Sequence, residues 1–265
     1  MTLVLAWPNR EESPTALHLA TDSLLSDTSG AQWQYAPKIN RVHLLHEFTG
    51  FCGTSNLAMA AILQCTSVLA AANVLGRGGS PREATLDARV RALVPLLDNA
   101  ICTFPKAWLG RGVTTLLYCG FDHRKAQFRL FEIALSTSGA SYKEKALSKQ
   151  HVVCYGSGAA KARALLADFK LANKTLATTD ILNVLKTVIE DRSIPSVGGA
   201  PQMIAITKHS SRLVGFNWEI AGKSESTLLG LPLRIRSSMA NIKFLDNQFR
   251  ESVYLHSPRI QRVAP

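Results

Sequence analysis

Three side chains near the start of the chain could act together in covalent catalysis. Thr2 follows the initiator methionine, which is readily removed ahead of a small residue. A chain that begins with threonine carries a hydroxyl nucleophile and a free amine, which can serve as its base, on one residue. A small second residue also occurs in many proteins without such chemistry. Thr2 is therefore a candidate nucleophile only if other residues support it.

Asp22 and Lys38 are the first candidates for that support, because each flanks an apolar run. Asp22 ends the predicted second strand, and Lys38 begins the third. A buried cation would keep the amine neutral and help deprotonate the hydroxyl, and a carboxylate would orient that cation. Antiparallel pairing of the strands could bring both side chains beside Thr2. Each alone would also suit a solvated turn.

Two glycine-containing segments could supply backbone donors. In "GFCGT", Gly53 stands where a strand enters a predicted helix, so its amide could point at a substrate carbonyl and stabilise an oxyanion. In "YGSGAAKA", Ser157 stands between a strand and a helix. An ordinary tight turn and an ordinary helix cap explain the two segments equally well. Neither a dinucleotide-binding glycine motif nor a GxSxG nucleophile motif is present.

The apolar runs predict blocks of strands and helices in alternation. The strands are expected at 2–7, 16–23, 38–45, 47–53, 112–122, 126–135, 151–156, 201–209 and 212–220, and the helices at about 56–76, from Ser80, at 157–172 and at 178–192. Ser80, Pro81 and Glu83 predict the start of the second helix, and Thr178 or Thr179 the cap of the last. Two facing sheets with helix pairs outside satisfy this order, so we expect an α+β fold, a four-layer αββα sandwich. Residues 2–221 form the expected core domain, and residues 222–265 lose clear periodicity and form a C-terminal appendage.

Composition and charge narrow the class of protein. The 265 residues are 46% hydrophobic and 18% charged, which suits one large domain with a sizeable core. The longest apolar stretch, 56–76, contains polar residues and predicts a buried helix, not a membrane span. The five cysteines are scattered and the start lacks a secretory signal, so we expect a cytoplasmic protein with no metal site and no cofactor. The net charge of +11 is spread along the chain, which disfavours nucleic acid as a partner.

The ordered set of motifs resembles the β-type subunits of the proteasome and the related bacterial ring protease that works with a AAA+ unfoldase. Both belong to the N-terminal-nucleophile (Ntn) hydrolases. The resemblance covers roughly residues 2–218, and the separation of Asp22 and Lys38 fits the family. The matching pieces are "TLVLAW", "HLATDSLLSD", "KINRV", "FTGFCGTSNLAMAAIL", "TTLLYCGFD", "YGSGAAKARALL" and "GGAPQMIAITK".

The resemblance implies a role for each matching position. Thr2 would be the nucleophile, with its freed α-amine as general base. Lys38 would lower the proton affinity around the hydroxyl, and Asp22 would orient Lys38. Gly53 would provide the oxyanion-hole amide, and Ser157 would relay protons at the amine. Ser26 and Phe51 would contact substrate, Phe51 lining the pocket that selects the side chain.

The loop "SIPSVGG" departs from the family pattern, because Ile194 and Val197 replace an acidic residue and a serine. Asp191, Ser193 or Ser196 would compensate only through a shifted loop. The expected protein is a threonine protease acting on peptides or unfolded proteins within a homo-oligomeric ring, with a AAA+ unfoldase as a further partner and no membrane association. The alternatives are a catalytically silent scaffold or binding subunit and an amidase for small molecules.

Overall fold

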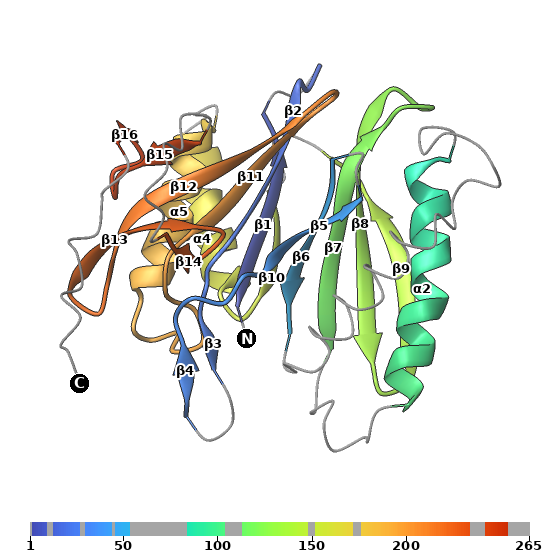
Figure 1. Ribbon diagram of the computed structural model, residues 1–265, viewed down its shortest axis with the longest axis horizontal. Helices are drawn as coiled ribbons and strands as arrows, with labels where there is room; N and C mark the ends of the chain where they lie inside the picture. The colour runs from blue at the N-terminus through green and yellow to red at the C-terminus, as the bar shows by residue number, and fades with distance from the viewer. Residues whose placement is uncertain are drawn as a thin grey trace, which may run out of the picture.

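The structure is a computed structural model that describes residues 2–9, 13–26, 30–43, 46–53, 84–103, 113–147, 152–171, 176–233 and 242–253. Two large β-sheets lie face to face at its centre, with helices on their outer faces (Figure 1). The helices are α2 (Leu86–Thr103), α4 (Ala159–Leu171) and α5 (Thr178–Glu190).

The larger sheet contains the strand that begins next to Thr2. Its main order is β10-β1-β2-β11-β12-β13-β14, and β15 pairs in parallel with β12 and carries β16 at its other edge. Its strands are β1 (Leu3–Pro8), β2 (Ala16–Thr21), β10 (Val153–Gly156), β11 (Gln202–Thr207), β12 (Ser211–Ile220), β13 (Lys223–Leu228), β14 (Leu231–Pro232), β15 (Lys243–Leu245) and β16 (Glu251–Ser252).

The second sheet has five antiparallel strands in the order β5-β6-β7-β8-β9. They are β5 (Ile39–His43), β6 (Glu47–Cys52), β7 (Thr114–Asp122), β8 (Gln127–Ser136) and β9 (Gly139–Lys145). A short hairpin of β3 (Leu25–Ser26) and β4 (Gln32–Trp33) links the two sheets along the chain.

Strand β1 is buried on both faces, which explains why "LVLAWP" reads as a continuous apolar run. Side chains of a strand alternate between faces. Val4 and Ala6 therefore enter the core between the two sheets, while Leu3 and Leu5 join the core under α4 and α5. A third core lies between the five-stranded sheet and α2.

The expected four-layer αββα sandwich, with a pair of helices outside each sheet, is wrong, because among the described residues a single helix, α2, lies on the five-stranded sheet. Among the described residues, 45% are in strands and 23% lie in three helices, so the structure is mostly β with large mixed sheets. One physical reason is that residues after 221 form further strands where an irregular appendage was expected. The helix expected at 56–76 and the start signal at Ser80, Pro81 and Glu83 lie outside the described residues, and α2 is the helix described on the five-stranded sheet.

Residues 223–252 include four strands that belong to the larger sheet. Strand β13 pairs with β12 through a turn at Ala221 and Gly222, both of which have positive φ, as the favoured two-residue hairpin turn requires. Leu245 and Phe249 are buried in the core under α4 and α5. The domain boundary at residue 221 stays a prediction. The N-cap of α5 is Ala177, so the cap expected at Thr178 or Thr179 is wrong by one or two residues.

No helix in the described part of the chain is long and apolar enough to cross a membrane.

Candidate functional site

Thr2 lies immediately before β1, and only 1% of its surface is exposed. Its hydroxyl accepts a hydrogen bond from the Lys38 ammonium and donates one to Asp22 Oδ1. The Thr21 hydroxyl lies 3.5 Å from the Thr2 hydroxyl. The structure therefore brings the three residues singled out by the sequence into one buried cluster, which we call the Thr2 cluster: Thr2, Asp22 and Lys38.

Asp22 is held in place by backbone amides as well as by Lys38. It directly follows β2, which pairs antiparallel with β1 so that Val4 lies opposite Thr21. The amide of Leu3 donates to Oδ1 at 3.0 Å, and those of Leu24 and Gly198 donate to Oδ2 at 3.2 and 3.1 Å. These three amides and the Lys38 ammonium together fix the position of the carboxylate.

Lys38 enters the cluster from the start of the five-stranded sheet. Its Nζ lies 3.0 Å from both carboxylate oxygens of Asp22, and both side chains are fully buried. Burial lowers the pKa of the Lys38 ammonium below its usual 10.5, and the nearby Asp22 carboxylate opposes part of this shift. Lys38 is thus a positioned proton donor that releases its proton more easily than a surface lysine.

The carbonyl of Thr2 is surrounded by the turn after β10. Ser157 Oγ donates to it at 3.4 Å, and the Gly158 amide does so at 3.5 Å. Gly156 has a φ of +100°, and a Cβ at this position would lie 1.9 Å from the Thr2 carbonyl oxygen. Only glycine lets the turn approach the first residues of β1 this closely. The structure thus places Ser157 at the carbonyl oxygen of Thr2, and its role as a proton relay at the amine stays a prediction.

Ser196 is the residue of the "SIPSVGG" loop that reaches this turn, since its hydroxyl lies 2.7 Å from that of Ser157. Asp191 instead pairs with Lys161 at 2.8 Å. Ser193 bonds to Asp191 through its own amide at 2.9 Å. Of the three residues considered as compensation in this loop, only Ser196 contacts the predicted site.

The remaining predicted residues lie at varying distance from the Thr2 cluster. Gly53 follows β6, and its glycine is required because a Cβ would lie 2.4 Å from the Thr114 hydroxyl. No hydrogen bond between Gly53 and Thr2 is present in the described contacts. Phe51 donates its amide to the Lys38 carbonyl at 3.0 Å, but its ring is buried in the core under α2. Ser26 is half-buried in the β3–β4 hairpin.

Three residues that sequence reasoning missed complete the site. Gln202 accepts the Lys38 amide at 3.0 Å and donates to the carbonyls of Asp22 and Ala36 at 3.2 and 2.7 Å, so it ties together both charged segments. Gly198 contributes the amide already described. Burial raises the pKa of the nearby Cys52 thiol to about 12, so Cys52 stays protonated at neutral pH.

A cavity of about 780 Å³ lies beside two residues that bind Asp22, and none of the three residues of the Thr2 cluster is among those that line it. Its walls include Leu24 and Gly198, whose amides bind Asp22, together with Gln34 and the loop 189–199. The cavity has the size of typical ligand pockets.

The comparisons with known proteins give no match: no protein-family model fits the sequence, and no curated protein matches it.

Proposed function

We propose that the chain is a threonine peptidase of the kind found in proteasome β-type subunits, with Thr2 as its nucleophile once Met1 is removed. The observation that carries this proposal is the contact of the Thr2 hydroxyl with both Lys38 and Asp22 in a fully buried cluster. A buried lysine–aspartate pair beside a hydroxyl is an arrangement that activates a nucleophile.

The proposed reaction uses only groups of the chain. Thr2 Oγ attacks the carbonyl carbon of the peptide bond, and its proton passes to the α-amine. The Lys38 ammonium stabilises the negative charge on Oγ, and Asp22 holds the ammonium in place. The amine then protonates the leaving nitrogen as the C–N bond breaks, which leaves an ester on Thr2. Water hydrolyses this ester, and the proton returns to Oγ.

Backbone amides are proposed to stabilise the oxyanion, with Gly53 as the donor. The Ser157–Ser196 pair contacts the Thr2 backbone and is proposed to relay protons to the α-amine. The cavity beside Leu24 and Gly198 is the proposed place for the substrate side chain nearest the reacting bond.

The proposal includes assembly of subunits into a ring with a AAA+ unfoldase as partner, peptides or unfolded proteins as substrates, and a cytoplasmic location. Free cysteines at 52, 102, 119 and 154 suit a reducing compartment. Light scattering tests the assembly, because a ring has several times the mass of the 28.8 kDa chain.

A catalytically silent subunit is the second candidate. Its support is the near-complete burial of Thr2, at 1% exposure, together with the pairing of Asp191 to Lys161 and not to the serine pair. A peptide would have to reach a hydroxyl that has no open surface in this structure.

Hydrolysis of a panel of fluorogenic peptides separates the two candidates. Thr2→Ser should keep activity, and Thr2→Ala should lower kcat by several orders of magnitude, because the covalent nucleophile is lost. Thr187→Ala is the matched control, since the described hydrogen bond of the Thr187 hydroxyl is to Asn183 within α5. Equal hydrolysis by wild type and Thr2→Ala would contradict the proposal. A purified, assembled wild type that is inert on all substrates and keeps Met1 would support the silent subunit.

A further inference from the structure

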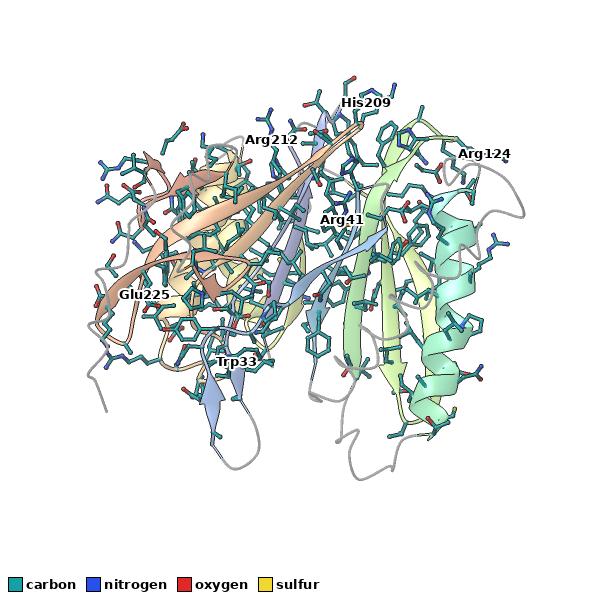
Figure 2. All side chains as sticks on the ribbon, viewed as in Figure 1. Trp33, Arg41, Arg124, His209, Arg212 and Glu225 are labelled. Atoms are coloured by element: carbon teal, nitrogen blue, oxygen red, sulfur yellow. The ribbon has the colours of Figure 1, made fainter. Side chains whose placement is uncertain are left out.

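A second cavity, of about 830 Å³, lies between the larger sheet, α5 and β15. His18, the third residue of β2, lines this cavity, whereas Asp22 follows the end of that strand. Four residues of extended strand span about 13 Å. In Figure 1, the N-terminus lies at one end of β1 and the β11–β12 turn lies toward the other end. Figure 2 shows Arg212 near this turn, which carries His209. The cavity is therefore separate from the Thr2 cluster.

The floor of this cavity is set by the register of four strands. Trp7 pairs with His18, His18 with Ala205, and Ala205 with Arg212. Directly opposed residues of antiparallel strands share one face of the sheet. The small side chain of Ala205 thus leaves room between a histidine and an arginine, and His18, Ala205 and Arg212 all line the cavity.

His18 presents a polar atom that the fold does not use. Only 9% of its surface is exposed, and its Nδ1 has no hydrogen-bond partner among the described residues. Its ring stacks on Trp7 with centroids 5.2 Å apart, which fixes its orientation. Burial lowers the pKa of the His18 imidazole to about 4, so the ring is neutral at pH 7 and one of its two nitrogens carries a proton that it can donate. A buried polar atom without a partner is unusual in a native structure and calls for a ligand or water.

The charges around the cavity favour an anion. Arg212 is exposed and lines the wall, and Lys243 pairs with Glu251 at 3.0 Å, so these three groups leave one net positive charge. Helix α5 begins at Thr178 on the same wall, and the amides at a helix N-terminus carry partial positive charge. Asp180 in this first turn is already bonded to the Ala177 amide at 2.8 Å.

The rest of the wall is apolar. Leu182 of α5, Met203 and Val214 of the sheet, and Leu245 and Phe249 of the C-terminal segment line it. A ligand that fits must therefore combine one acidic group with a hydrocarbon body. A carboxylate is planar and accepts the forked hydrogen bonds of a guanidinium.

We infer that this cavity binds a medium-chain aliphatic carboxylate, with its acidic group between His18 and Arg212 and its hydrocarbon chain against Met203, Leu182 and Phe249. The site does not depend on Thr2 or on hydrolytic activity, so the inference can be tested independently of the proposed function.

Calorimetric titration of the full-length protein with decanoate, below its micelle-forming concentration, tests the inference. We expect one decanoate per chain, and much weaker binding of decan-1-ol, which lacks the charge. Arg212→Gln should weaken decanoate binding at least about tenfold, because hydrogen bonds to charged groups are the stronger kind. His18→Phe keeps the stacked ring and should weaken binding by a factor of about three to ten.

Ala205→Leu should abolish binding by filling the space between His18 and Arg212. Lys223→Gln, an exposed change of the same charge outside the cavity, should bind as the wild type does. If Ala205→Leu does not fold, the inference is still tested by Arg212→Gln, a change of an exposed residue, and by the comparison of decanoate with decan-1-ol. The inference is overturned if folded wild type does not bind decanoate, if decanol binds equally well, or if Arg212→Gln and His18→Phe both leave the affinity unchanged.

Discussion

Replacement of Lys38 by methionine should measure how strongly the Thr2 cluster depends on its buried charge pair. Methionine keeps most of the length of the side chain and removes the charge. Breaking a buried ion pair costs about 3–5 kcal/mol, because it leaves the partner charge uncompensated. Asp22 would keep three backbone amide donors, from Leu3, Leu24 and Gly198. We therefore expect Lys38→Met to lower the free energy of unfolding by about 3 kcal/mol, the lower limit of this range.

Asp22→Asn should lower the free energy of unfolding by as much or more. In this variant Lys38 would lose its partner carboxylate and keep only the Thr2 hydroxyl among its described side-chain contacts. The double variant should lose less than the sum of the two single losses, with a coupling free energy of about 1–3 kcal/mol. Urea unfolding at pH 7 gives these free energies if the slopes agree. Lys143, which is exposed and shares the Glu132 carboxylate with Lys145, provides the control, and Lys143→Met should lower the free energy of unfolding by at most about 1 kcal/mol. Additive losses, or a Lys38→Met protein as stable as the wild type, would refute the reasoning.

Three further predictions concern other parts of the fold. The pKa of His18 is about 4 in the folded chain and 6.5 in the reference state, so its stabilising contribution is complete above pH 6.5 and is lost as the pH falls through 4. The stability difference between pH 7 and pH 4 should thus be about 3 kcal/mol smaller in His18→Phe than in wild type, and equal acid sensitivity would contradict this. Phe249 packs on Phe216 and Trp218, so Phe249→Ala should cost about 3–5 kcal/mol in urea unfolding, and deletion of 222–265 should prevent folding as judged by circular dichroism. Gly156→Ala should lower both thermal stability and peptide hydrolysis, because the added Cβ would displace the Thr2 carbonyl, and an unchanged melting temperature would argue against the tight turn.

The sequence predicts the Thr2 cluster because its members flank apolar strands whose ends antiparallel pairing can bring together. Asp22 and Lys38 are polar residues at the ends of buried runs, and antiparallel pairing leaves few other places for them. Gln202 and Gly198 could not be found in this way. They reach Asp22 from more than 170 residues along the chain, through pairing of β11 with β2 that no local pattern encodes.

The fold was predicted in part. The nine strands expected in the first 220 residues each lie close to a described strand, because their apolar runs are long or alternate clearly, whereas β3, β4 and β9 were not predicted. The tail strands were missed, since β13 is mostly polar over Lys223–Glu225 and its burial begins only at Ser226. The Ala221–Gly222 turn was the available signal, because a glycine in a two-residue turn between strands favours a hairpin. The sandwich expectation assigned this segment no place in a sheet, and it placed a pair of helices outside the five-stranded sheet, where one described helix, α2, lies.

Covalent labelling of Thr2 tests the central claim most directly. The purified protein is treated with a peptide epoxyketone, which reacts with the hydroxyl and the free amine of an N-terminal threonine, and is then analysed by intact mass and peptide mapping. The account predicts a chain without Met1 that carries one adduct, located on Thr2, and no adduct in Thr2→Ala. An adduct on another residue, or a chain that keeps Met1 and remains unlabelled, would contradict it.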